Sequence, residues 1–247
     1  MAILRRVKCV VSYDGTNFNG FQIQKEARSV QEEIQLALFK IHREAVHITA
    51  SGRTDSGVHA YGQVFHFDTP LSLDEKEWTR ALNANLPEDI HILSSEFVDS
   101  SFHARFNAKE KAYIYHLSTG EYNPLRRNYC YQYGRFLDFK RMEEASKLFI
   151  GEHDYRNFCS NGLDEVESFV REIKSIEFNI IDDELVITFK GTGFLRYMVR
   201  MMVGTLIAIG AHKETKDYIL KRLDNKERLV TTYNAPAMGL YLKEVKY

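Results

Sequence analysis

Hydrophobic residues recur with two different periods along this chain. Residues 8–13 form a β-branched run that ends at Asp14-Gly15, the pattern of a strand closed by a turn. Over residues 30–41 the apolar positions recur every three or four residues, which predicts an amphipathic helix. Ser29 with Glu32 three residues later is the pattern of a capping box, so we expect this helix to begin directly after Ser29.

The alternation of strands and helices continues through the first hundred residues. Residues 62–67 alternate as a strand, and 73–85 suggest a helix that ends before Pro87. Residues 90–98 predict a further strand. Together these elements predict an α+β subdomain at residues 1–101.

Residues 102–247 predict a second subdomain of the same kind. Its expected elements are strands at 102–106, 112–119, 171–181, 184–190 and 239–245, and helices at 139–150 and 194–209. No linker rich in Pro, Gly or Ser separates the two halves. The pattern therefore favours the α+β class, with two similar subdomains whose antiparallel sheets join into one continuous sheet flanked by helices.

The segment 194–209 is apolar almost all round, which is typical of a buried helix. We do not expect it to cross a membrane, because the apolar run after Arg200 reaches about eleven residues and a bilayer needs about twenty. On such a helix Arg196 and Arg200 lie one turn apart and share a face. A guanidinium cannot lose its proton, so a buried one needs a carboxylate partner, whereas one that reaches solvent does not. Reaching solvent is a reasonable interpretation for Arg196.

The charge balance limits how strongly the protein as a whole can attract a negatively charged ligand. The 247 residues include 33 Lys and Arg against 34 Asp and Glu, a formal net charge of −1, whereas an RNA-binding protein usually has an excess of positive charge. An RNA ligand would therefore require basic residues gathered on one surface. The candidates are Lys25 with Arg28, Arg105 with Lys109 and Lys111, and the pair Arg126-Arg127, and each is explained equally well as a solvated charge.

The cysteines and histidines indicate neither disulfides nor a metal site. The three cysteines are an odd number at wide spacing, with no Cys-x-x-Cys. The nine histidines lack a ligand spacing such as His-Glu-x-x-His, so we expect no metal and hydrogen-bonded structural roles for His59, His66 and His103. The first residues lack the apolar core of a signal peptide, so we expect a cytoplasmic protein.

Residues 51–60 have neither helical nor strand periodicity and carry Arg53, Asp55 and His59 among glycines. Glycines permit positive φ angles and close approach to a ligand. Arg53 and Asp55 are two positions apart, so in extended backbone their side chains leave the same face and could meet one substrate. For a single Gly-Arg-x-Asp loop, a surface turn with an exposed ion pair is the simpler interpretation.

This loop is one of many matches to a known family. Residue for residue, SGRTDSGVHA at 51–60 resembles the signature loop of the tRNA pseudouridine synthase A (TruA) family. Further matches run in order along nearly the whole chain: VSYDGTNFNGFQIQ at 11–24, RSVQ at 28–31, GQV at 62–64, HFD at 66–68, NANLP at 83–87, FHARF at 102–106, KAYIY at 111–115, GEHD at 151–154, GFLRYMVR at 193–200 and GLYL at 239–242. Their joint occurrence at family-like spacing is highly specific.

The resemblance implies the pseudouridine synthase fold and an isomerase that acts on uridines 38–40 of the tRNA anticodon stem-loop. It also implies a homodimer. The reaction breaks the N-glycosidic bond of uridine, turns the base and re-joins it through C5 without redox or hydrolysis, so no cofactor or metal is expected. One departure is Arg196, at a position where the family often has tyrosine or histidine.

The same resemblance assigns roles to individual residues. Asp55 matches the catalytic aspartate, and Arg200 matches the arginine that pairs with it, which would lower the pKa of the carboxyl group by roughly 1–3 units. Tyr113 matches the active-site tyrosine, which stacks on the uracil and mediates transfer of the C5 proton. Arg53 matches a residue that holds the target nucleotide out of the RNA helix. The substrate-binding set is completed by Tyr113, His59, Lys25 and Arg105.

The chemistry of the residues leaves alternatives open. Asp55 could attack C1′, add to C6 or remove a ribose proton to give a glycal, and family analogy favours the glycal. A nucleosidase-type hydrolase could use the same carboxylate, but such enzymes usually need a second acid, and no comparable loop carries one. A non-catalytic RNA-binding protein would need none of Asp55, Tyr113 and Arg200.

In the strand KAYIY at 111–115 the side chains of Tyr113 and Tyr115 lie on the same face, and we expect Tyr115 to pack in the core.

Overall fold

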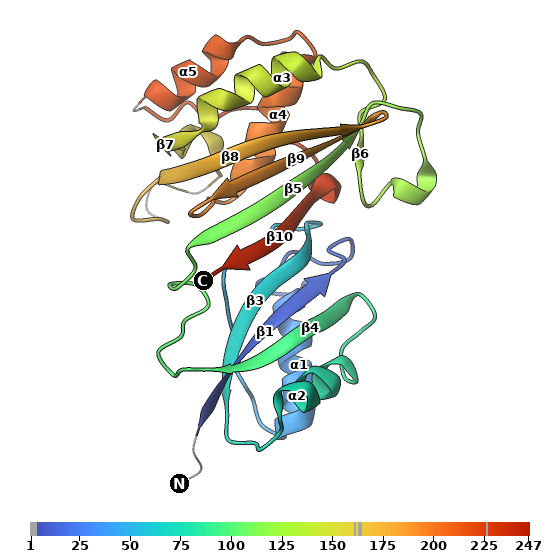
Figure 1. Ribbon diagram of the computed structural model, residues 1–247, viewed down its shortest axis with the longest axis vertical. Helices are drawn as coiled ribbons and strands as arrows, with labels where there is room; N and C mark the ends of the chain where they lie inside the picture. Colours follow the sequence, from blue (N-terminus) through green and yellow to red (C-terminus); the bar gives the residue numbers. More distant parts are fainter. Residues whose placement is uncertain (1–3, 161, 163–164, 226) are drawn as a thin grey trace. The chain divides into compact units, whose positions relative to one another are not determined.

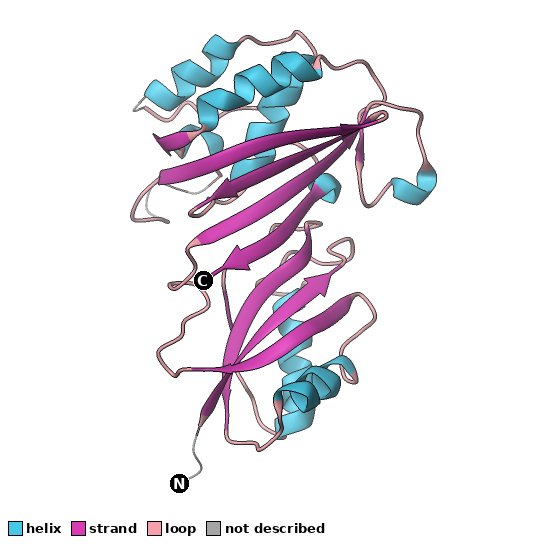
Figure 2. Cartoon of the chain, viewed as in Figure 1, coloured by secondary structure: helices cyan, strands magenta, loops and turns pink. Residues whose placement is uncertain are grey.

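The computed structural model describes residues 4–160, 162, 165–225 and 227–247. It is a mixed α+β protein in which β-sheet is flanked by helices, as predicted (Figure 2). The chain divides into two compact units, one formed by residues up to Lys109 together with Leu242–Tyr247, and the other by Glu110–Tyr241. Residues 102–109 and the end of the chain, which the sequence division assigns to the second subdomain, cluster with the first unit.

The first unit is built on strands in the order β4-β1-β3-β10. These are β4 (Ile90–Val98), β1 (Arg5–Tyr13), β3 (His59–Thr69) and β10 (Leu240–Lys246), with the short β2 (Thr49–Ala50) beside β3. β1 is antiparallel to both β3 and β4. Alternate residues of β1 from Val7 to Tyr13 are buried, as expected for a strand with one face on the core.

Two helices cover this sheet on one face, α1 (Val30–His42) and α2 (Glu75–Asn83) (Figure 1). The Ser29 side chain accepts a hydrogen bond from the backbone of Glu32, so α1 begins where the sequence predicts. Trp78 of α2 is fully buried, and its ring lies 5.4 Å from that of His42 and 5.1 Å from that of Phe67. These three rings join both helices to β3.

The second unit has the strand order β5-β9-β8-β7, all antiparallel. The strands are β5 (Glu110–Ser118), β9 (Glu184–Gly191), β8 (Val170–Ile181) and β7 (Gly151–Asp154), and the short β6 (Tyr131–Gln132) runs parallel to β5. Its helices are α3 (Phe139–Ser146), α4 (Met198–Gly210) and α5 (Lys216–Asp224), with short 3-10 helices at Pro124–Arg126, Lys147–Phe149, Arg156–Phe158 and Ala237–Gly239. All but one residue of α4 are buried, which confirms a core helix.

Two sequence predictions about secondary structure are wrong. Residues 102–106 form a turn and not a strand. The helix predicted from residue 194 begins at Met198, because Tyr197 adopts the left-handed conformation with φ of 62°. Arg196 therefore lies before the helix and is exposed, and it does not share a helical face with Arg200.

Other boundaries differ less. The helix expected at 139–150 ends at Ser146 and continues as a 3-10 turn. Helix α5 was not predicted, and neither were the strands β2, β6 and β7, which are too short for a periodic pattern. No helix within the described ranges is long and apolar enough to cross a membrane.

Candidate functional site

Asp55 lies on the loop between β2 and β3, and the loop is tied to β1 through its neighbour Thr54. The hydroxyl groups of Thr54 and Tyr13 share a hydrogen bond of 2.8 Å in the buried interior. The carbonyl oxygen of Thr54 accepts a hydrogen bond of 3.2 Å from the backbone N–H of Phe21. The residue before the carboxylate is thus held on both its side chain and its backbone.

The segment after β1 braces the other side of this loop. The carbonyl of Phe18 accepts hydrogen bonds from the backbone N–H of Gly57 at 3.2 Å and from the Ser56 hydroxyl at 3.3 Å. Gly20 has φ of +88°, and a Cβ atom there would lie 2.5 Å from the carbonyl oxygen of Thr54. Only glycine permits this approach. The segment after β1 thus braces the Asp55 loop, a role that its match to the family motif does not indicate.

His59 begins β3, four residues after Asp55, and is 2% exposed. Its Nδ1 accepts a hydrogen bond of 3.0 Å from the backbone N–H of Gly15 and lies 3.1 Å from Oδ1 of Asp14. These contacts agree with the expected structural role. They anchor the end of the loop to the turn after β1.

The other candidates in the first unit are surface residues. Arg53 is exposed on the Asp55 loop. Lys25 is exposed in a tight turn where Gln24 and Ala27 form a β-bridge. Arg105 is exposed in the turn before β5. All three side chains are accessible from solvent.

Arg28 differs from these surface residues because it forms ion pairs with two carboxylates. Its guanidinium lies 2.6 Å from Asp89 and 2.7 Å from Glu33, and it lies 4.2 Å from the centre of the Phe18 ring. The hydrogen bonds that Arg28 donates to Asp89 outweigh the effect of burial and raise the pKa of Arg28. Arg28 therefore holds α1 to the start of β4 and supports Phe18.

The second unit carries Tyr113 and Arg200. Tyr113 on β5 is 9% exposed, and its ring packs edge-to-face on Phe194 with 5.0 Å between centroids. Tyr115, two residues on, is fully buried and donates a hydrogen bond of 2.8 Å to the carbonyl of Pro236. The expectation that Tyr115 belongs to the core is confirmed.

Arg200 lies in the first turn of α4 and is held by the segment before β10. Its Nε donates a hydrogen bond of 2.8 Å to the carbonyl of Ala235, and the backbone N–H of Ala235 donates one of 2.9 Å to the carbonyl of Arg200. The guanidinium carbon lies 4.7 Å from the centre of the Tyr197 ring. A Cβ atom on Gly204 would lie 2.8 Å from the backbone nitrogen of Asn234, so only glycine permits this close approach. The plane of the guanidinium is fixed by these contacts.

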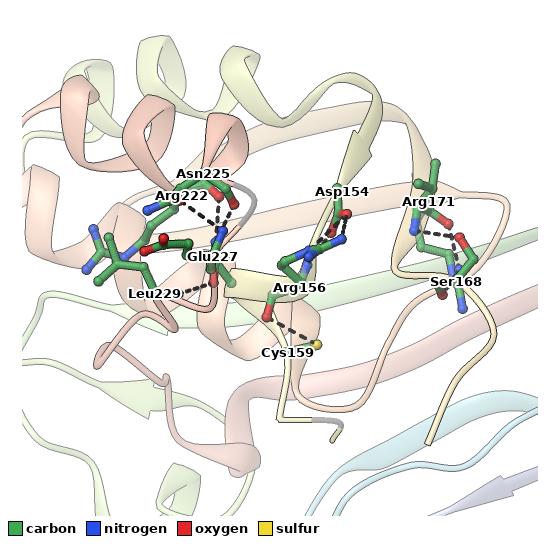
Figure 3. Close-up of polar contacts among 11 residues, drawn as sticks. Asp154, Arg156, Cys159, Ser168, Arg171, Arg222, Asn225, Glu227 and Leu229 are labelled. Carbon is green, nitrogen blue, oxygen red and sulfur yellow. Dashed lines mark hydrogen bonds and ion pairs between the residues drawn. The ribbon is translucent and has the colours of Figure 1, made fainter. Parts of the chain in front are cut away.

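A buried asparagine fixes the chain that leads to Ala235. The side-chain amide of Asn157 donates hydrogen bonds to the backbone carbonyls of Arg222, Asn225 and Glu227 at 3.0, 3.1 and 3.2 Å. Its Oδ1 accepts one from the N–H of Leu229. Figure 3 labels these four partner residues. Asn157 is fully buried, and its own carbonyl accepts from the N–H of Thr231 at 2.9 Å. Sequence reasoning missed this residue, because a single asparagine carries no periodic or motif signal.

One basic candidate of the second unit, Arg126, also forms an ion pair. Arg126 pairs with Glu184, whose carboxylate lies 2.7 Å from Nδ1 of His116. Burial opposes ionisation of Glu184, but the hydrogen bonds from His116 and Arg126 outweigh it and hold the pKa of this carboxyl group below its ordinary value. Arg127 is exposed. Among the described residues, no three His, Cys, Asp or Glu side chains are grouped as ligands for a metal ion.

A carboxylate on a loop that is held in place before a ligand arrives is the arrangement expected of an enzyme that works by carboxylate chemistry. The chain matches the family model for tRNA pseudouridine synthase over residues 9–107 and 145–247, and it belongs to this family. It is 48% identical over 245 residues to the tRNA pseudouridine synthase A of Bacillus pumilus, covering 98% of this chain and 99% of that protein. The enzymes of the same name from a Geobacillus species and Anoxybacillus flavithermus are 47% and 45% identical over 245 residues, with coverage of 98% to 99% of each chain.

Proposed function

We propose that this chain converts uridine into pseudouridine at positions 38–40 of the tRNA anticodon stem-loop. Family membership supports the isomerase class and the tRNA substrate. The observation that carries the proposal within the molecule is the braced loop, which holds Asp55 beside the buried Thr54. A reaction that depends on one carboxylate requires this carboxylate to be positioned before the substrate arrives.

The reaction sets three demands on the protein. The bond between N1 and C1′ breaks, the uracil turns while it stays bound, and a bond forms between C5 and C1′. The proton on C5 leaves, and a proton returns to N1, so that atoms balance. The site must supply a carboxylate, exclude water that would release free uracil, and accept the C5 proton.

Asp55 supplies the carboxylate and acts on the ribose, by the glycal route. Arg200 pairs with it and keeps it ionised. The hydrogen bond from Nε of Arg200 to Ala235 supports this role, because it fixes the direction of the guanidinium.

Tyr113 stacks on the uracil, and its hydroxyl mediates removal of the C5 proton. Its edge-to-face contact with Phe194 supports this role by fixing the ring plane. Arg53 holds the extruded nucleotide, with phosphate contacts from Lys25 and Arg105. The exposure of these three basic side chains supports contact with the RNA backbone.

The decisive experiment is to map pseudouridines in unmodified tRNA after treatment with the purified protein and its Asp55→Asn variant. We expect modification at positions 38–40 with the wild type and none with the variant, whose tRNA affinity stays within about tenfold because phosphate contacts carry most of the binding. Asp182→Asn, in the exposed turn between β8 and β9, is the matched control and keeps full activity. Release of free uracil would establish the hydrolase instead, and binding without any reaction would establish a non-catalytic RNA-binding protein.

We further propose that the protein acts as a homodimer in the cytoplasm. The connection from β5 to α3 supports a partner surface, because its apolar side chains are unusually exposed. They are Tyr122 at 68%, Leu125 at 82%, Tyr129 at 45% and Phe136 at 78%. Light scattering coupled to gel filtration tests the dimer, and a monomeric mass at micromolar concentration would contradict it.

A further inference from the structure

The turn formed by residues 102–107 in the first unit displays an aromatic ring to solvent. The side chain of Phe106 is 75% exposed. The turn that carries it connects β4 to β5 and is held in one conformation by hydrogen bonds from inside and outside the turn.

Hydrogen bonds within the turn fix its backbone. Nδ1 of His103 accepts from the backbone N–H groups of Arg105 and Phe106, each at 3.2 Å. The N–H of Asn107 donates to the carbonyl of His103 at 3.0 Å, and its side-chain Oδ1 accepts from the His103 N–H. The position of Phe106 is therefore set by His103.

Three residues elsewhere in the same unit form hydrogen bonds with the backbone of the turn. Nδ1 of His66 on β3 accepts from the N–H of Ala104 at 3.2 Å, and the Tyr247 hydroxyl donates to the carbonyl of Ala104 at 2.7 Å. Arg6 on β1 donates to the carbonyl of Phe102 at 2.8 Å. Burial lowers the pKa of His66 to about 4, with smaller contributions from the charges of Arg6 and His103, so the ring stays neutral and its Nδ1 stays an acceptor.

The side chains on the turn form a stacked group. The rings of His103 and Phe106 lie 4.3 Å apart at an interplanar angle of 26°, and the guanidinium of Arg105 lies 5.8 Å from the Phe106 ring. An exposed, immobilised aromatic ring with a cation beside it combines the two groups that bind unpaired nucleotides, because every base can stack and every nucleotide carries a phosphate.

We propose that Phe106 is a stacking platform for one nucleobase of the bound tRNA, and that Arg105 binds the adjoining phosphate. The inference rests on the proposed function, since it takes tRNA as the ligand. A preorganised turn lowers the entropic cost of binding, which explains why five residues inside and outside the turn fix a ring that contributes little to the core.

Phe106→Ala tests the platform through the affinity for unmodified tRNA. We expect Kd and KM to rise about tenfold with kcat little changed, because a stacked base contributes to binding and not to the chemistry. Phe106→Tyr should restore wild-type affinity. Phe39→Ala is the matched control, since Phe39 is 50% exposed on α1 and lies outside the turn. Wild-type Kd for Phe106→Ala would overturn the proposal, and so would a change of oligomeric mass as its only effect.

A fluorescent variant keeps the test valid if Phe106→Ala folds poorly. Trp78 is the only tryptophan and is fully buried, so the wild type gives a steady background. We expect the emission of Phe106→Trp to be quenched by tRNA with the Kd of binding. Binding without quenching would overturn the platform. Absence of tRNA binding by the wild type would instead overturn the proposed function, so the two failures are distinct.

Discussion

The Asp55 loop in the first unit and Arg200 in the second are fixed in different ways. The loop is braced by residues 13–21, which contact it through backbone groups and a buried pair of hydroxyls. Arg200 is held by Ala235, at the end of a long connection whose course depends on Asn157. The loop is thus positioned by one neighbouring segment of the chain, whereas the arginine is positioned by a series of single contacts. This difference predicts which substitutions strongly reduce stability and activity and which reduce them only in part.

Gly20→Ala should have the largest effect. The new Cβ would lie 2.5 Å from a backbone oxygen next to Asp55, at a φ of +88°, so we expect a loss of about 3 kcal/mol in the free energy of unfolding. The displaced loop should lower kcat at least about a hundredfold. Chemical denaturation and single-turnover pseudouridine formation measure the two effects.

Gly134→Ala is the matched control for this experiment. Gly134 also has positive φ, at +64°, but a Cβ atom there meets nothing within 4 Å. We expect it to cost about 1 kcal/mol from backbone strain alone and to leave kcat unchanged. Equal effects of the two substitutions would mean that the close approach of Gly20 does not position the loop.

Asn157→Ala should have an intermediate effect on stability and a graded effect on activity. It leaves buried carbonyls and an N–H without their partner, which costs about 2–3 kcal/mol. Because the chain from Asn157 reaches Arg200 through Ala235, we expect kcat to fall about tenfold while Kd for tRNA holds. Asn179→Ala, exposed on β8, is the control. An unchanged kcat in a destabilised Asn157→Ala protein would show that this support is structural only.

The smallest effect is the coupling between the two regions. If Arg200 pairs with Asp55, a double-mutant cycle of Arg200→Met and Asp55→Asn should give about 1–2 kcal/mol of interaction energy in denaturation experiments. The double variant should be more stable than additivity predicts, because both charges are removed together. Simple addition of the two single losses, within about 0.5 kcal/mol, would place the residues out of contact.

Local patterns predicted those elements whose own residues decide them. β4 was predicted at residues 90–98 and is observed at Ile90–Val98, and α1 begins after Ser29 as its cap requires. A local pattern fails where distant residues decide the backbone conformation, as at the strand predicted for residues 102–106. Residues 102–106 have the composition of a strand, but His66 and Tyr247 bond the backbone of Ala104 and hold it in a turn.

The sequence by itself determined the α+β class and the family, and it identified Asp55, Tyr113 and Arg200 as candidate site residues. Motifs and periodicity depend only on residues that are close together along the chain. Only the tertiary structure showed which residues hold these candidates in place. It showed that Arg28 and Arg126 form ion pairs with carboxylates, that Arg196 lies outside α4, and that Asn157 holds the chain near Arg200. A contact between residues far apart along the chain depends on packing, and packing has no local pattern from which it can be predicted.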